Sequence, residues 1–194
     1  NSESRWQGPW VGPVTVQVVS GITVRGRRAL RRHLELLLQQ ASQELWIANA
    51  YFIPGARLLR MLTRTARRGV DLRLLLPGRT DQPFVQAAGR PTHGQLLKAG
   101  VILLECPDRM LHAKAAVVDR HWALIGSANL DPRSFRHNLE LNLALDHPAI
   151  IERLRELFLQ EAGKSVGVSL EAFARRSWLD RLWQRLAYAC RWWL

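Results

Sequence analysis

Residues 111 to 145 read LHAKAAVVDRHWALIGSANLDPRSFRHNLELNLAL, and this stretch decides the fold. Leu111 to Val118 and Trp122 to Ile125 are each predicted to form a strand, and a tight turn joins them. Side chains two apart in a strand point to the same face, so we expect His112 and Lys114 to lie together. An imidazole and an ammonium group then share one small volume.

Further polar groups follow the second strand. The segment GSAN, residues 126–129, comes at its carboxyl end, where α/β sheets place ligands. The run from Asn138 to Leu145 then alternates polar and apolar residues, so Glu140 and Asn142 are predicted to share one polar face. A carboxylate on that face is able to orient an imidazole nitrogen.

Together these groups suit phosphoryl transfer, which needs a nucleophile or acid and donors that neutralise the phosphoryl oxygens. His112 could attack phosphorus or protonate the leaving oxygen. Lys114 and Asn129 could bind the phosphoryl oxygens, and Ser127 could donate a further hydrogen bond. Glu140 could hold the imidazole ring. This chemistry requires no metal ion and no cofactor, and the sequence predicts none.

Outside this stretch, strand-like and helix-like segments alternate along the chain. Strands are predicted at 14–19, 45–49, 70–76 and 101–105, and helices at 27–43, 58–69, 93–99 and 148–161. Such alternation predicts an α/β fold, in which a sheet is layered with helices.

The composition points to an anionic partner. The 194 residues carry a formal net charge of +12 and 47% of them are hydrophobic, which predicts a folded core with a basic exterior. Three of the 28 basic residues are lysine and the other 25 are arginine, whose planar guanidinium suits phosphate. Nucleic acid and acidic lipid both fit. The two cysteines are too few for a disulfide framework and form no CxxC zinc site.

The two ends of the chain differ from its middle, residues 14–163, which we expect to form one catalytic lobe. Residues 1–13 are rich in Gly and Pro and are typical of an interdomain linker. Residues 164–194 form a basic, Trp-rich tail in which 177–194 places Trp and Leu at helical spacing among arginines. This pattern predicts an amphipathic helix that either lies in a membrane interface or packs on the domain or a partner.

The motif in the central stretch resembles that of a known superfamily. The segment from His112 to Asn129 matches the HxK(x)4D(x)6GSxN signature of the phospholipase D superfamily at every defined position. Glu140 sits where members carry the glutamate that hydrogen-bonds the catalytic histidine. Asp119 is expected to pair with a basic group and fix the turn. The catalytic set that the resemblance implies is His112, Lys114, Asp119, Ser127, Asn129 and Glu140.

Within the superfamily, the chain from about Val14 onward is similar to bacterial cardiolipin synthases. Asn49–Pro54 resembles their PYF-x-P segment, Arg67–Arg73 their ARRGVxVR stretch and Leu96–Val101 their LLxAGV. The tail looks most like that of the B-type synthase. The resemblance implies a phospholipase D-like mixed sheet flanked by helices, with a C-terminal amphipathic helix. It also places three residues near the substrate entrance: Tyr51, Phe52 and Pro54.

Cardiolipin synthases carry two copies of the motif, one in each pseudo-symmetric half, and this sequence contains one. Their mechanism uses two facing histidines: one forms a phosphatidyl-histidine intermediate, and the other serves as acid and then base. The resemblance therefore implies one lobe of a two-lobe enzyme, here the carboxyl-terminal half. A second lobe with the HxK(x)4D part of this signature, the HKD motif, would come from the same full-length chain or from homodimerisation.

The resemblance to half of such an enzyme leaves three functions open. The first is phosphatidyl transfer to phosphatidylglycerol by an enzyme bound peripherally to the cytoplasmic face of the bacterial inner membrane. The second is a homodimeric phospholipase D-type nuclease or phosphodiesterase, since the positive charge would attract nucleic acid. The third is an inactive half that binds anionic phospholipid surfaces. The YFIP segment and the tail favour the first.

Overall fold

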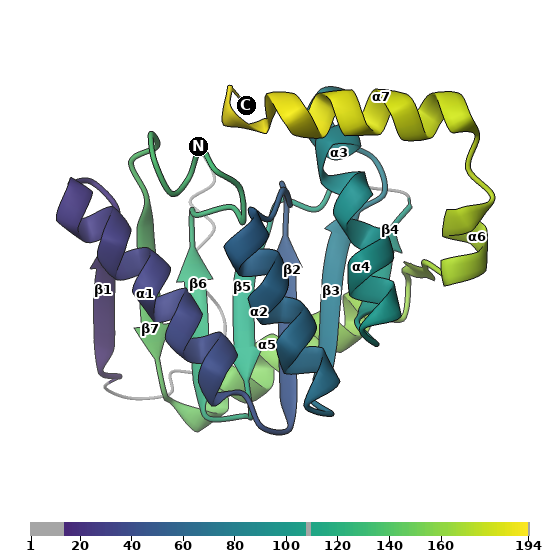
Figure 1. Cartoon of the computed structure of the whole chain (residues 1–194). Coiled ribbons are helices and arrows are strands. Elements are labelled where there is room, and N and C mark those ends of the chain that lie inside the picture. The colour runs from purple at the N-terminus through teal and green to yellow at the C-terminus, as the bar shows by residue number, and fades with distance from the viewer. Residues whose placement is uncertain (1–13, 108–109, 194) are drawn as a thin grey trace, which may run out of the picture.

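The computed structural model describes residues 14–107 and 110–193, and the linker predicted at residues 1–13 lies outside the described residues. Within them, one mixed sheet forms the centre of the molecule, and helices cover both of its faces (Figure 1). Its strands run in the order β1-β7-β6-β5-β2-β3-β4-β8. Their bounds are β1 (Val16–Ser20), β2 (Glu44–Asn49), β3 (Asp71–Pro77), β4 (Ile102–Cys106), β5 (Lys114–Val118), β6 (Trp122–Gly126), β7 (Leu141–Leu145) and β8 (Val166–Gly167).

The helices cover the two faces unequally. α1, α2 and α4 pack on one face of the sheet, and α5 packs on the other. The predicted α/β fold, with a mixed sheet flanked by helices and a C-terminal helix, is confirmed. The helices are α1 (Val24–Gln40), α2 (Ala56–Arg67), α3 (Pro83–Gly89), α4 (His93–Lys98), α5 (Pro148–Ala162), α6 (Leu170–Ala174) and α7 (Trp178–Ala189), with short 3-10 turns η1 (Arg90–Thr92) and η2 (Cys190–Trp192).

The centre of the sheet sets the position of the site. β2, β3 and β4 are parallel, and their sequences are apolar runs because both faces are covered. Leu74 joins the core under α1 and α2, and the next residue, Leu75, joins the core under α5. β5 runs antiparallel to β2 with Lys114 opposite Asn49. The end of β2 and the start of β5 therefore meet at one edge of the sheet.

The turn between β5 and β6 is as tight as the sequence predicts. Asp119 and Arg120 have φ of 48° and 58°, the positive values of a type I′ turn. The backbone N–H of His121 closes the turn by donating to the carbonyl oxygen of Val118 at 2.9 Å. Asp tolerates the left-handed region better than most residues, which suits the first of these positions.

The predicted tail, residues 164–194, contacts the rest of the fold at two places. β8, which lies in the predicted tail, pairs antiparallel with β4 and so joins the sheet. α7 lies across the edge of the sheet and packs on α3, where Ala187 is fully buried (Figure 1). Its other side is exposed to solvent. In the described part of the chain, no helix has the length and apolar character needed to span a membrane.

Candidate active site

An open cleft of about 500 Å³ lies at the edge of the sheet where β6 ends and β5 begins. It brings together five of the six residues of the predicted catalytic set and leaves out Asp119. The described residues that line it are His112, Lys114, Gly126, Ser127, Asn129, Asn138, Leu139 and Glu140.

The side chains of His112 and Lys114 are in direct contact. Lys114 Nζ lies 3.1 Å from Nδ1 and 3.2 Å from Nε2 of the His112 ring, and it donates to the His112 carbonyl oxygen at 2.9 Å. The predicted proximity of His112 and Lys114 is confirmed, but it does not arise from two positions on the same face of one strand. β5 begins at Lys114, so His112 lies before the strand, and the ammonium group folds back toward it.

The charge on Lys114 is set by opposing effects. Burial lowers the pKa of Lys114 below its ordinary value of 10.5, while the carboxylates of Glu140 and Asp131 act to raise it. The two carboxylates thus stabilise the ammonium form in a partly desolvated place. A cation held in this way is suited to bind phosphoryl oxygens.

Ser127 and Glu140 hold each other beside the histidine. The Ser127 hydroxyl donates to Glu140 Oε2 and accepts from the Leu141 N–H at 2.9 Å. Glu140 is only 4% exposed, so its carboxylate needs such a donor. The expected hydrogen bond between Glu140 and His112 is not among those of the described residues, because the ring nitrogens face Lys114 instead.

The polar face predicted for residues 138–145 points inward. β7 begins at Leu141, and Glu140 and Asn142 are buried while the leucines at 139, 141 and 143 are exposed. The buried amide leaves no room opposite it: a Cβ at Gly126 would lie 2.2 Å from Asn142 Oδ1. Only glycine fits there, which explains the first residue of the GSxN segment.

Asn129 and the residue after it are held by polar groups from two segments, residues 49–51 and the loop that carries Ser134. Its backbone N–H donates to Ser134 Oγ at 3.0 Å, and its Oδ1 accepts from the Tyr51 N–H at 3.2 Å. The next residue, Leu130, donates its N–H to Asn49 Oδ1 at 3.1 Å. Since Oδ1 is engaged, the NH2 group of the Asn129 side chain is the part that can donate to a ligand.

Of the three residues predicted at the substrate entrance, only Tyr51 makes a ring contact with a residue of the cleft, and its ring stands edge-on to His112. Phe52 is buried in the main core. Pro54 is buried beneath the tail, where its carbonyl oxygen accepts from the Tyr188 hydroxyl at 3.2 Å. Side chains alternate along extended backbone, so these two neighbours point away from the cleft.

Asp119 lies at the opposite end of β5 from the cleft, and its carboxylate organises the start of β2. Oδ2 accepts from the N–H and the hydroxyl of Ser42 at 2.7 and 2.9 Å, and Oδ1 accepts from the N–H groups of Gln43 and Glu44, each at 2.8 Å. Within the described residues these donors replace the expected basic partner, because the N–H groups that lead into a strand need acceptors. The position supports a structural role.

Three residues that hold Tyr51, Asn129 or Leu130 in place were not predicted: Asn49, Asp81 and Ser134. Asn49 ends the apolar run ELWIAN, and a polar residue at that point could have revealed it. Asp81 accepts from the Tyr51 hydroxyl at 2.7 Å, and Ser134 supports Asn129. Both lie in segments that the fold brings to the cleft, and no local pattern marks them.

The sequence matches a known protein family. Residues 34–162 match the family described as "Cardiolipin synthase, PLD-like domain". Cardiolipin synthase B of Salmonella typhi is 44% identical over 130 residues, which are 67% of this chain and 32% of that protein. Cardiolipin synthase of Listeria welshimeri is 31% identical over 166 residues, 86% of this chain and 34% of that protein. The chain thus spans about one third of the length of these relatives.

Solved structures share the fold at low sequence identity. Nuc of Salmonella typhimurium, a phospholipase D family member, superposes with a TM-score of 0.69 at 17% identity, covering 81% of this chain and 99% of that one. Phosphatidylserine synthase of Haemophilus influenzae gives a TM-score of 0.72 at 16% identity, covering 91% of this chain and 45% of that one. The sheet and its helices are therefore of the phospholipase D type.

Proposed function

The chain belongs to the family of cardiolipin synthases with a PLD-like domain, and we propose that it forms one lobe of a phospholipase D-type phosphatidyltransferase that makes cardiolipin. The observation that carries the proposal is the cleft that gathers His112, Lys114, Ser127, Asn129 and Glu140. These side chains supply an imidazole, a cation, neutral donors and a buried carboxylate, as transfer at phosphorus requires. Among the described residues that line the cleft, one is a histidine, so the proposed mechanism needs a second HKD lobe to complete the site.

The proposed reaction moves a phosphatidyl group from one phospholipid to the terminal hydroxyl of phosphatidylglycerol. A histidine nitrogen attacks phosphorus, the bond from phosphorus to the headgroup oxygen breaks, and that oxygen takes a proton from the opposite histidine. The latter then removes the proton of the incoming hydroxyl, which attacks the phosphatidyl-histidine and frees the ring. When the donor is phosphatidylglycerol, the released alcohol is glycerol.

We assign His112 the acid and base role and the nucleophile to the second lobe, as the likeness to two-copy relatives implies. Lys114 and Asn129 bind the phosphoryl oxygens. Ser127 holds Glu140, whose negative charge stabilises the imidazolium that forms on His112. Asp119 and Asn49 act on the scaffold and do not touch the substrate.

An exposed apolar strip supports the proposal of a second lobe. It lies on the same face of the sheet as α5, beyond the part that α5 covers, where β1 pairs with β7. It consists of Val16, Val18, Leu139, Leu141 and Leu143. Leu139, at 72% exposed, also lines the cleft. Apolar side chains in such a continuous strip are stabilised when a partner covers them. A lobe seated on this strip would meet the cleft at its open side.

The exposed side of α7 supports binding to a membrane surface. We define the α7 stripe as Trp178, Leu179, Leu182, Trp183 and Leu186, all exposed. Tryptophan and leucine with flanking arginines are typical of a helix that lies in the lipid interface. The stripe would hold the cleft near its lipid substrates on the cytoplasmic face of the inner membrane. A nuclease, which the net charge of +12 also suits, has no need of this stripe.

The test is a chimera of Cardiolipin synthase B in which the matched third is replaced by residues 14–194 of this chain. With phosphatidylglycerol vesicles, the chimera should form cardiolipin and glycerol, and its His112→Ala variant should form none. His121→Ala, a histidine in the turn at the far end of β5, is the matched control and should retain activity. A folded but inactive chimera, or activity that survives His112→Ala, would contradict the proposal. Plasmid cleavage instead would support the nuclease.

A further inference from the structure

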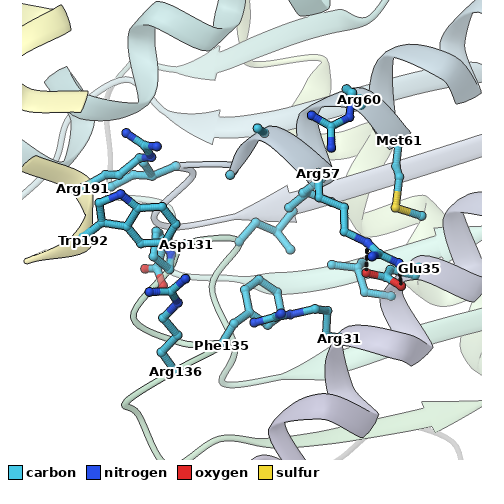
Figure 2. Close-up of a pocket in the computed structure, with 17 residues that line it drawn as sticks. Arg31, Glu35, Arg57, Arg60, Met61, Asp131, Phe135, Arg136, Arg191 and Trp192 are labelled. Carbon is cyan, nitrogen blue, oxygen red and sulfur yellow. Dashed lines mark hydrogen bonds and ion pairs between the residues drawn. The ribbon is translucent and has the colours of Figure 1, made fainter. Parts of the chain in front are cut away.

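A second cavity, of about 380 Å³, lies between α1, α2, the loop at residues 130–136 and the end of the tail (Figure 2). Its volume is within the range of roughly 300–1,000 Å³ that small-molecule sites occupy. Counting described residues, it shares no lining residue with the His112 cleft. The two are nevertheless neighbours, because Leu130 and Asp131 of the cavity directly follow Asn129 of the cleft. The cavity is therefore a separate place on the same edge of the lobe.

The floor of the cavity is apolar. Its aliphatic and aromatic side chains come from both helices, from the segment just before α2 and from the loop. They are Leu34, Ile53, Leu58, Met61, Leu130 and Phe135. A floor of this kind favours a hydrocarbon chain over a free ion, since apolar area removed from water is the main gain.

The rim of the cavity is basic, with five arginines around it: Arg31, Arg57, Arg60, Arg136 and Arg191. Arg57 is paired with Glu35 at 2.6 Å. The other acid in the described lining, Asp131, accepts from the Ser134 N–H. The acids thus leave a surplus of positive charge on the rim.

The indole of Trp192 orders part of this rim. Arg136 stacks over its ring at 4.0 Å and Arg191 at 4.7 Å, each measured to the ring centroid (Figure 2). On the opposite side, Arg31 lies 5.9 Å from the centroid of Phe135. Guanidinium groups held over aromatic rings keep their N–H donors available for an anion.

The first turn of α2 adds backbone donors. Gly55, its N-cap, also lines the cavity and provides no side chain to bond the first N–H groups of the helix. This end of the helix therefore favours the same negative charge as the arginines.

From the apolar floor and the basic rim we propose that this cavity binds one anionic phospholipid as a bound, unreacting lipid. The phosphate lies among the guanidinium groups, and an acyl chain lies on the floor between α1 and α2. The inference goes beyond the proposed function, because it needs neither His112 nor a second lobe. The loop at residues 130–136 forms part of the wall of this lipid site. Ser134 of the same loop also accepts the hydrogen bond from the Asn129 N–H.

The test uses dioctanoyl phosphatidic acid with a photoreactive group at the end of one chain, at a concentration below that at which it forms micelles. After irradiation of the full chain, mass spectrometry should find the label on α2 and on the 130–136 loop. The same label should appear in His112→Ala protein, so failure of catalysis and failure of this inference are distinguishable. Label confined to the His112 cleft or to α7 would overturn the inference.

Variants on α2 separate a built site from general attraction. Arg60→Ala should weaken binding at least about tenfold, the loss of one charge-assisted hydrogen bond. Arg64→Ala, one turn on and outside the cavity, removes the same charge and should change little. Met61→Trp fills the floor and should abolish labelling at an unchanged melting temperature. Equal losses from Arg60→Ala and Arg64→Ala would overturn the inference.

Two further arms identify the ligand. Inorganic phosphate should compete only weakly, because it has no acyl chain. Dioctanoyl phosphatidylcholine should compete less well than the anionic lipid, because it has no net negative charge. Competition by inorganic phosphate as strong as by the lipid would mean a phosphate site and would overturn the inference. The last outcome concerns self-association. If the wild-type chain took up no lipid label and Met61→Trp changed its oligomeric mass in solution, a second copy would cover the cavity, and the inference would be overturned.

Discussion

The Tyr51 ring stands edge-on to the His112 ring, with 6.2 Å between the ring centroids and 86° between the ring planes. Tyr51 is fixed at both ends, because its hydroxyl donates to Asp81 and its backbone N–H donates to Asn129. One residue therefore contacts the proposed acid-base and also orients the amide proposed to bind phosphate. Edge-to-face contacts of this kind favour a defined ring orientation.

The Tyr51→Phe variant should lose stability in a pH-dependent way. Burial and the Asp81 carboxylate raise the pKa of Tyr51 from 10.0 to about 12, so the stabilisation is complete below pH 10 and is lost as the pH rises toward 12. The same hydrogen bond lowers the pKa of Asp81, so the stabilisation is present above the ordinary value of 3.8 and is lost in stronger acid. Thermal unfolding should show wild type more stable than Tyr51→Phe at neutral pH, with the gap closing at both extremes.

Tyr188→Phe is the control for that measurement. The Tyr188 hydroxyl donates to the carbonyl oxygen of Pro54, which does not titrate. The loss of melting temperature in Tyr188→Phe should therefore stay the same as the pH falls into the acid range. A gap between wild type and Tyr51→Phe that stayed constant from acid to alkali would contradict the assigned pair.

Lys114 should make catalysis sensitive to alkali at a lower pH than an ordinary lysine would. Its ammonium form binds the phosphoryl oxygens, and burial lowers the pKa of Lys114 below 10.5, so activity should fall as the pH rises toward that value. Lys114→Arg should have a lower rate, but its activity should not fall at alkaline pH, because arginine stays charged there. Lys114→Met should lose about a hundredfold in rate, the effect of removing one transition-state donor. Cardiolipin formation by the chimera, with Lys98→Met as the control, measures all three.

Asp119 should matter for stability far more than for chemistry. Asp119→Ala removes the acceptor of four hydrogen bonds at the start of β2 and should lower the free energy of unfolding by about 2 kcal/mol. Asp119→Asn keeps one oxygen and tolerates the left-handed backbone, so it should lose about half as much. Urea denaturation measures both. Equal losses, or an active-site defect at a temperature where both variants are folded, would point to a different role.

The arrangement of elements was predictable because it depends on local patterns. The apolar runs of β2 and β3 and the helical spacing of leucines in α1 follow from which side chains must leave water. The motif likewise led to the contact of His112 with Lys114, although it assigned both to a strand that begins only at Lys114. Periodicity identifies an element but sets its ends only approximately.

What could not be predicted depends on segments that are distant in the sequence. The donors to Asp119 come from residues 42 to 44, some 75 residues earlier, and no spacing rule connects them. The inward turn of Glu140 and Asn142 also depends on a partner, because alternation is the same whichever face is buried. Only the pairing of β7 with β6, with Asn142 opposite Gly126, decides that the polar face is the inner one.

The α7 stripe should contribute to membrane binding apart from the charge of the tail. Trp178→Ala combined with Leu182→Ala removes two exposed apolar side chains and should weaken binding to phosphatidylglycerol vesicles by roughly tenfold or more. The loss should persist at high salt, since it is not electrostatic. Trp122→Ala, an exposed tryptophan on β6, is the matched control in a cosedimentation assay. Unchanged binding by the double variant would leave α7 without a role at the membrane.

The exposed strip on β1 and β7 should be the seat of the second lobe. Leu141 and Leu143 are both exposed, so replacing them with lysine should leave the melting temperature of the isolated chain close to wild type. In the chimera, or in any dimer of the chain, the two lysines would be buried without partners, and each buried charge costs several kcal/mol. Cardiolipin formation and self-association should therefore both fall by more than about a hundredfold. Leu36→Lys, an equally exposed leucine on α1, should change neither, because α1 packs on the other face of the sheet.

If the strip variant kept full activity while His112 was still required, the second histidine would have to approach from elsewhere. The side of the cleft opposite Leu139 would then be the place to look.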